Sequence, residues 1–223
     1  MLSRYVPAFL DLFAETSLTY YHNQWALIEL SKNPNTQDHL RVELLQNFPT
    51  DDPTWEQLTN PDALPYLDAV VHEVLRLHPS IPEIIRIVRG FLLPGVHNCS
   101  KGNDRDDPWQ ATEDDILPLS TPLLTSSGFL VNNIHISKGS LVGIPIACVN
   151  RSAVFWGEES KVFKPERWMD AGGGGGDDER WQEISGYRHL LTFGDGPRVC
   201  LGRGFALAEI KVCIVFLWPF LDD

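Results

Sequence analysis

The sequence predicts a mainly α-helical chain with small β-sheets, an α+β fold, and three observations carry this prediction. Apolar residues recur at the spacing of one helix face over residues 63–77. A second apolar helical segment begins near Leu201 and runs to about Trp218. Short β-branched runs bounded by turn residues fill the middle of the chain. With 223 residues, the chain is long enough to bury a core.

The first 79 residues are expected to form a helical part. Residues from about 5 to 32 have helical composition, and Pro34 ends this segment because proline lacks the amide hydrogen that a helix interior needs. Residues 36 to 48 are predicted to form a second, amphipathic helix. A short helical turn is expected near Trp55 to Leu58.

The helix predicted over residues 63–77 has the clearest pattern in the chain. Its apolar residues recur at i, i+3, i+4, i+7 and i+8, which places them in a stripe along one face. These residues are Leu67, Val70, Val71, Val74 and Leu75. His78-Pro79 ends the helix, since the residue before a proline is driven out of the helical conformation. We therefore expect one face of this helix to lie in the core.

Residues 80–170 are expected to be rich in β-structure. The strand candidates are Ile84–Val88, Phe129–Val131, Ile134–Ile136 and Ser140–Ile146. Turns are predicted between them at Asn132-Asn133 and Lys138-Gly139, because these residue types favour turns.

Two further segments have no periodic pattern. Residues 89–110 are dominated by Gly, Asn, Asp, Pro and Ser and interrupt the β-rich part as an insertion. Residues 171–183 begin with a run of glycines and are expected to form a surface loop without core-forming capacity. Residues 190–218 then form the last part, a loop followed by the final helix.

The composition excludes several classes of function. The net charge of −12 argues against nucleic acid and anionic membrane surfaces as primary partners. The four cysteines contain no C-x-x-C pair, which fits free thiols in a reducing compartment better than a disulfide scaffold or a zinc site. No signal peptide and no run of about 18 uncharged apolar residues is present, so no segment is predicted to span a bilayer.

The most informative run of the chain is Phe193 to Gly202. Gly194 and Gly196 allow positive φ and a close approach of the backbone to a flat ligand. Arg198 can pair with a carboxylate. Cys200 is expected at the start of a helix, where unpaired amides and the helix dipole favour the thiolate. Such a thiolate is suited to be an axial ligand of haem iron. The alternative is a buried structural cysteine beside a glycine turn.

The full run matches F-G-x-G-x-R-x-C-x-G and resembles the haem-binding signature of the cytochrome P-450 superfamily. The resemblance implies haem b as the cofactor and Cys200 as the axial ligand of its iron. It also implies a partial cytochrome P-450 fold, the C-terminal half only, because it covers about residues 8 to 88 and 111 to 218.

The resemblance implies further residues that bind the cofactor. Arg198 and Arg86 are expected to supply two cations to the two haem propionates, although a surface arginine is the alternative for Arg86. Phe193 is expected to pack beside the thiolate. The glycines of the loop, Gly194, Gly196 and Gly202, complete the expected cofactor-binding set.

A second resemblance concerns charged residues with a structural role. Glu73 and Arg76 lie three residues apart on the predicted helix, where an exposed ion pair of little energetic value is one interpretation. The segment resembles the E-x-x-R helix of the family, and Phe163 to Trp168 resembles its P-E-R-W motif. In that family this pair and the later arginine form a buried network. Glu73, Arg76 and Arg167 are therefore expected to have structural roles.

The candidates for proton delivery are Glu15 and Thr16. The segment Ala14 to Ser17 resembles the acid–alcohol motif of the family's central helix, but two residues of the motif are missing. Losing two residues rotates one part of a helix against the other by about 200°. Glu15 and Thr16 are carried as candidates on this basis.

By this resemblance the chain is identified as part of a haem-thiolate monooxygenase. The resemblance implies an NADPH-dependent reductase or another redox partner, dioxygen and a small organic substrate. The chain is similar to fungal members of the superfamily that act in secondary or xenobiotic metabolism. Their full-length chains are expected at the endoplasmic-reticulum membrane. One alternative is a non-catalytic truncated fragment, or pseudo-enzyme, lacking the distal pocket. Another is a soluble interaction domain with an incidental cysteine loop.

Overall fold

The computed structural model describes residues 17–48, 53–87, 114–138, 140–169 and 179–217. The chain divides into two compact units. The first is formed by Met1–Pro82 together with Ile146–Asp223, and the second by Glu83–Pro145. Helices make up most of the first unit and two small antiparallel sheets make up the second, so the α+β prediction is confirmed.

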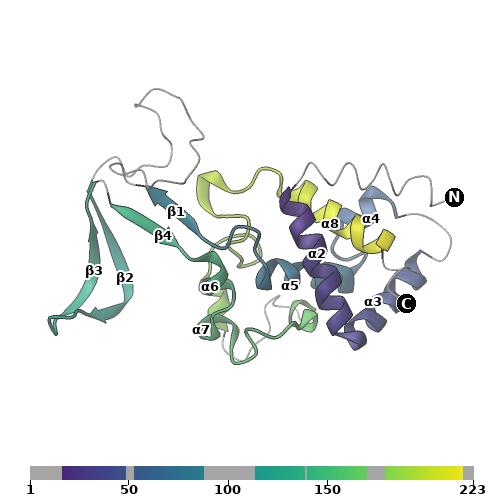
Figure 1. Ribbon diagram of the computed structural model, residues 1–223, viewed down its shortest axis with the longest axis horizontal. Helices are drawn as coiled ribbons and strands as arrows, with labels where there is room; N and C mark the ends of the chain where they lie inside the picture. Colours follow the sequence, from purple (N-terminus) through teal and green to yellow (C-terminus); the bar gives the residue numbers. More distant parts are fainter. Residues whose placement is uncertain (1–16, 49–52, 88–113, 139, 170–178, 218–223) are drawn as a thin grey trace, which may run out of the picture. The chain divides into compact units, whose positions relative to one another are not determined.

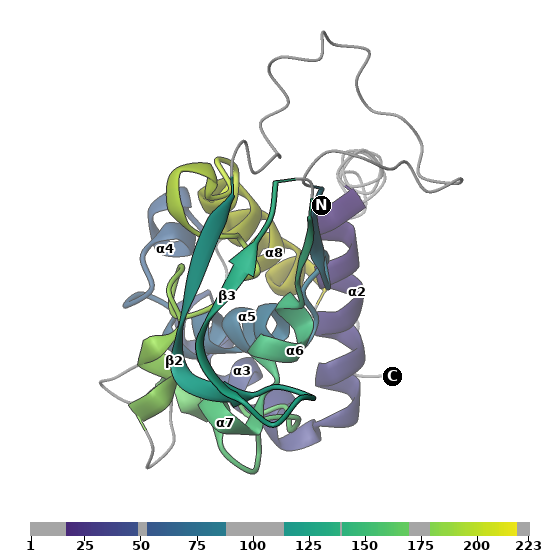
Figure 2. The same cartoon turned by 90° about the vertical axis from the view of Figure 1, so that its left-hand side faces the viewer.

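The helical unit is built around α5 (Pro65–Leu77), in which every residue from Tyr66 to Leu77 is buried. The helix is therefore buried on all sides and not only on the apolar face that the sequence predicted. Helices α2 and α8 pack against α5 and against each other, as Figures 1 and 2 both show. The other helices of this unit are α3, α4, α6 and α7. The bounds are α2 (Ser17–Lys32), α3 (Pro34–Asn47), α4 (Trp55–Thr59), α6 (Ile146–Asn150), α7 (Ala153–Trp156) and α8 (Arg203–Leu217).

The helix boundaries follow from local chemistry. Helix α2 ends at Lys32, as predicted, and Pro34 then serves as a first-turn residue of α3, where its missing amide hydrogen costs no hydrogen bond. Thr54 caps α4 through a capping box, since its hydroxyl accepts from the Gln57 amide and the Gln57 side chain accepts from the Thr54 amide. The helices predicted over 36–48 and 63–77 are confirmed to within about two residues.

The second unit contains two separate sheets. Strand β1 (Ile84–Ile87) pairs antiparallel with β4 (Leu141–Ile144), and β2 (Asp115–Leu124) pairs antiparallel with β3 (Leu130–Ile136). The β2–β3 hairpin turns at Gly128, whose φ of 81° lies in the left-handed region that glycine adopts without strain.

The turn predicted at Asn132-Asn133 is wrong. Both asparagines lie inside β3, and Asn133 is paired with Pro118 of β2. The strand continues through them because β2 supplies backbone partners, while their side chains remain exposed. Sequence reasoning also missed β2 itself. The strand predicted over Ser140–Ile146 is shorter than expected, because Pro145 precedes α6.

Several predictions concern residues outside the described part of the chain. They include the first helix before Ser17, the insertion at 89–110, and most of the glycine-rich loop. Glu15 and Thr16 also lie outside the described residues. Of the helices that are described, none has the length and apolar character needed to cross a membrane.

Candidate functional site

The cysteine loop runs from Phe193 to the start of α8. Cys200 donates its amide to the carbonyl of Phe193 at 2.8 Å, which closes the loop, and its own carbonyl accepts from the Arg203 amide at 3.4 Å. Gly194 and Gly196 have φ values of 72° and 74°, so the positive φ predicted for them is confirmed. The loop therefore places Cys200 three residues before Arg203, the first residue of α8.

The surroundings of Cys200 leave room for a flat ligand. The cysteine is exposed, which excludes a buried structural thiol. A Cβ atom built on Gly196 or Gly202 meets nothing within 4 Å. Leu201 is fully exposed and Phe205 is 59% exposed, so apolar surface lies next to the cysteine in the sequence. An open, glycine-lined loop carrying a thiol at a helix start fits a haem group.

The two arginines predicted to bind the haem propionates belong to different units. Arg198 is the last residue of the 3-10 helix η4 (Gly196–Arg198), two residues before Cys200. Arg86 lies on β1 of the second unit, where its backbone pairs with Val142. Their meeting at one cofactor stays a prediction.

The carboxylate of Glu73 is the centre of a buried network. Both of its oxygens accept from Arg76, at 2.8 Å from Nε and 2.8 Å from Nη2. Arg167 Nε donates at 3.1 Å and the Trp168 indole at 2.9 Å. The Lys164 amide completes the set at 2.9 Å. The structure thus brings Glu73, Arg76 and Arg167 together, as the sequence suggested.

The network is held in the protein interior. Glu73 and Arg76 are both 0% exposed, so the interpretation of an exposed ion pair is wrong. Burial alone would raise the pKa of Glu73, but the hydrogen bonds and charges of Arg76 and Arg167 outweigh it and hold the pKa below its ordinary value. A buried carboxylate is stable in this setting because charged donors satisfy both oxygens.

Arg76 connects this network to the segment that follows α6. Its Nη1 donates to the carbonyl of Asn150 at 2.9 Å, and its Nη2 donates to the carbonyl of Val162 at 3.2 Å. Its guanidinium also lies 5.2 Å from the centre of the Trp156 ring, a cation–π contact. One side chain therefore fixes the path of the chain between α6 and the P-E-R-W segment.

Asn150 continues the connection to the cysteine loop. Its side-chain Nδ2 donates to the Thr192 hydroxyl at 2.9 Å, and its Oδ1 accepts from the Leu191 amide at 3.3 Å. Thr192 donates in turn to the carbonyl of Leu75 at 2.8 Å. Sequence reasoning assigned no role to Asn150 or Thr192, because nothing local marks an amide side chain that acts across the fold.

Replacing Asn150 with alanine is expected to lower the free energy of unfolding by about 1–3 kcal/mol. The change removes the acceptor of the Leu191 amide and the donor to the Thr192 hydroxyl, and both hydrogen bonds are partly buried. Urea unfolding of the full-length gene product measures the effect. The control is Asn47→Ala, since Asn47 is exposed and its side chain donates to the Glu43 carbonyl of its own helix. If both variants lower the free energy of unfolding by the same small amount, the role of Asn150 is contradicted.

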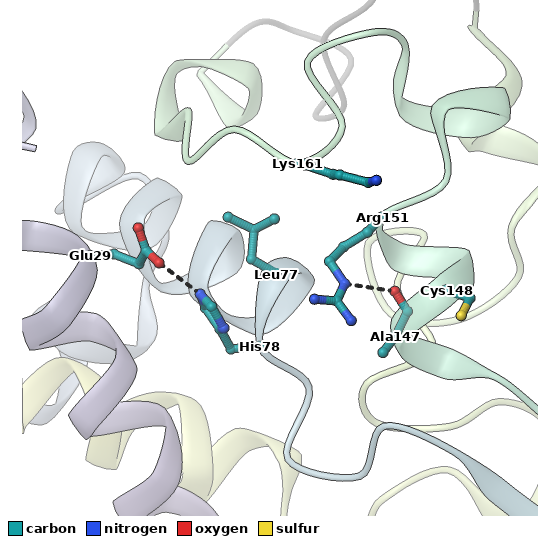
Figure 3. A pocket seen from close by; sticks show the side chains of 7 residues that line it. All are labelled: Glu29, Leu77, His78, Ala147, Cys148, Arg151 and Lys161. Atoms are coloured by element: carbon teal, nitrogen blue, oxygen red, sulfur yellow. Dashed lines mark hydrogen bonds and ion pairs between the residues drawn. The ribbon is translucent and has the colours of Figure 1, made fainter. Parts of the chain in front are cut away.

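A pocket of about 480 Å³ lies at the C-terminal end of α5 (Figure 3). Its lining residues are Glu29, Leu77, His78, Ala147, Cys148, Arg151 and Lys161. His78 contacts the Glu29 carboxylate at 3.0 Å and stacks on Trp25 with ring centres 3.8 Å apart. Burial lowers the pKa of His78 although Glu29 opposes this. None of these lining residues is a predicted site residue or belongs to the cysteine loop.

Comparisons with known proteins agree with the motifs. The family described as Cytochrome P450 matches residues 13–93 and 114–217. The gap between the matched ranges overlaps the insertion expected at 89–110.

Curated relatives extend this match. Cytochrome P450 monooxygenase claO of Ampulloclitocybe clavipes is 51% identical over 203 residues, covering 91% of this chain and 32% of that protein. Cytochrome P450 monooxygenase claQ of the same fungus is 53% identical over 193 residues, covering 86% and 30%. Cytochrome P450 monooxygenase 128 of Postia placenta is 37% identical over 213 residues, covering 95% and 32%. The chain spans about a third of the length of these relatives.

Proposed function

Because the chain belongs to the cytochrome P450 family, we propose that it is the haem-binding part of a haem-thiolate monooxygenase. The family supports a monooxygenase and a haem cofactor in general, and several relatives carry that activity in their names. The proposal adds haem b as the cofactor, Cys200 as the ligand of its iron, and the insertion of oxygen into an organic substrate.

The observation that carries the proposal is the exposed thiol of Cys200 on an open glycine loop before α8. The residues proposed to hold the haem are those that the sequence indicated: Cys200, Arg198, Arg86, Phe193, Gly194, Gly196 and Gly202. When bound, the haem supplies the iron at which dioxygen is activated.

The chain's own residues prepare this site. The Cys200 amide is already bonded to Phe193, which fixes the direction of the cysteine relative to the loop. The network of Glu73, Arg76 and Arg167, extended by Asn150, holds the segment that leads into the loop. Glu15 and Thr16 are proposed to deliver protons. A preorganised site of this kind spends no energy on rearrangement during the reaction.

The partners belong to the same proposal. Electrons would come from an NADPH-dependent reductase or another redox partner, and dioxygen and a small organic substrate of secondary metabolism would be consumed. The full-length protein is proposed to act at the endoplasmic-reticulum membrane. The net charge of −12 supports the expectation that nucleic acid is not a partner.

The alternative is a non-catalytic fragment that lacks the distal pocket. It is retained because the chain matches only about a third of the length of its relatives. The exposed apolar side chains Leu201 and Phe205 also agree with a surface that other segments cover.

Spectroscopy of the full-length gene product tests the proposal. After reduction under carbon monoxide, we expect the red-shifted Soret band of a thiolate-ligated haem. A spectrum typical of nitrogen ligation would overturn the assignment of Cys200. Haem titration of the 223-residue chain alone then separates the two candidates. Stoichiometric uptake with a thiolate spectrum supports the haem-binding part, and absent uptake supports the non-catalytic fragment.

A further inference from the structure

A second buried ionic cluster lies on α5, on residues that the Glu73 network does not use. Its centre is Asp68, which is buried among charged partners. The Oδ1 atom of Asp68 lies 2.7 Å from Nζ of Lys211, and Oδ2 lies 3.2 Å from Nη2 of Arg188. Nδ1 of His72 is also near, at 3.3 Å from Oδ2. These three partners of Asp68 differ from Arg76 and Arg167, which pair with Glu73.

The two cations that pair with Asp68, Arg188 and Lys211, lie before and after the cysteine loop in the sequence. Arg188 precedes the loop, in the turn that leads into Phe193. Lys211 follows the loop, on the helix α8 that begins directly after it. A single carboxylate on α5 therefore binds the chain both before and after Cys200.

The turn before the loop has an unusual backbone. Arg188 and His189 have φ values of 49° and 59°, a left-handed conformation that non-glycine residues seldom adopt. A Cβ atom on Gly186 would lie 2.5 Å from the Leu190 carbonyl oxygen, so the turn is also tightly closed. Such a conformation persists only where surrounding contacts hold it. The ion pair between Arg188 and Asp68 ties this turn to α5, together with the ring of Tyr187, whose centre lies 5.6 Å from that of His72 on α5.

The buried ammonium group of Lys211 on α8 also relies on Asp68 for a charged partner. Lys211 is only 3% exposed, and its ammonium also donates to the Leu58 carbonyl of α4 at 3.1 Å. A buried ammonium is costly unless an acid pairs with it. Glu43 lies close enough to interact with Lys211, but its two oxygens accept from the amides of Tyr66 and Leu67 at the start of α5.

We propose that Asp68 is a positioning residue for Cys200, which clamps the segments before and after the cysteine loop onto α5. The inference rests on the proposed function, in which Cys200 is the iron ligand. The charge state of Asp68 agrees with this role. Burial would raise the pKa of Asp68, but the hydrogen bonds and charges of His72 and Lys211 outweigh it and hold the pKa well below its usual range. The carboxylate therefore stays ionised under ordinary conditions.

The test uses the full-length gene product and the variant Asp68→Asn, which keeps the size of the side chain and removes its charge. We expect the reduced carbonyl complex to contain a larger share of the form that has lost thiolate ligation. We also expect amide hydrogen exchange about tenfold faster over 186–193 and 203–211, with α2 unchanged. The control is Asp38→Asn, since Asp38 forms an exposed ion pair with Arg41 on α3.

A second variant keeps the test decisive if Asp68→Asn does not fold. Arg188→Gln removes only the contact before the loop, and Arg188 is 29% exposed, so the core is left intact. Faster exchange over 186–193 and a larger share of thiolate-free complex support the inference. Suppose that the wild-type protein has the thiolate band and that the variants have the same band and the same rates of amide exchange. The inference about Asp68 is then overturned, while the proposed function stands. If the wild-type protein lacks the band, the proposed function fails and the inference falls with it.

Discussion

Replacing Cys200 with alanine is expected to abolish the red-shifted Soret band of the reduced carbonyl complex. The band requires a thiolate on the iron, and Cys200 is the thiol that the loop exposes before α8. Cys213 is a poor substitute, because burial and the nearby Glu209 raise its pKa to about 12 and its sulfur accepts a hydrogen bond from Asn23. The absorption spectrum of the full-length variant under carbon monoxide measures the effect.

The matched control for this prediction is Cys148→Ala. Cys148 is also a free, exposed cysteine, but it lies on α6 and lines the pocket at the end of α5. The control protein is expected to keep the band. If the Cys200→Ala protein keeps the band, Cys200 is not the ligand of the iron, whatever the control shows.

The variant Arg76→Met is expected to cause the largest loss of stability, about 3–5 kcal/mol in the free energy of unfolding. Methionine fills much of the space but donates no hydrogen bonds. The Glu73 carboxylate would remain buried without its two-point partner, and the carbonyls of Asn150 and Val162 would lose a donor. Urea unfolding of the full-length protein, followed by tryptophan fluorescence, measures the change.

Arg180→Met is the control for Arg76→Met. Arg180 also faces a glutamate three residues away, at 3.5 Å from Glu183, but both side chains are exposed. Exposed pairs contribute little, so the control is expected to change stability by less than about 1 kcal/mol. Similar losses in the two variants would show that the Glu73 network does not carry the stability assigned to it.

The helices and the cysteine loop were largely predictable because their signals are local. The apolar stripe of residues 63–77 led directly to α5, and the glycines at 194 and 196 have the positive φ that their residue type allows. Prediction failed where a neighbouring strand overrides residue preference. Asn132 and Asn133 favour a turn by type, yet both lie in β3, where Asn133 pairs with Pro118 of β2.

The buried charges mark a second limit of local reasoning. The residue pattern alone left Glu73 and Arg76 open to an exposed pair, and only the family resemblance implied a buried network. No role was assigned to Asp68 or Asn150. Their burial depends on how the rest of the chain packs around α5, including the P-E-R-W segment. Apart from the pair of Glu73 and Arg76, their partners are distant in the sequence. No pattern within one helix contains that information.

Local residue pattern is thus enough to establish the family, the haem-ligand candidate and the course of α5, because backbone preference and motif spacing act over a few residues. Packing alone decides that three of the charged side chains of α5, Asp68, Glu73 and Arg76, face the interior. Charges taken out of water must find partners wherever the fold brings them. Only the folded chain therefore reveals that Asp68 and Asn150 reach the segments beside Cys200.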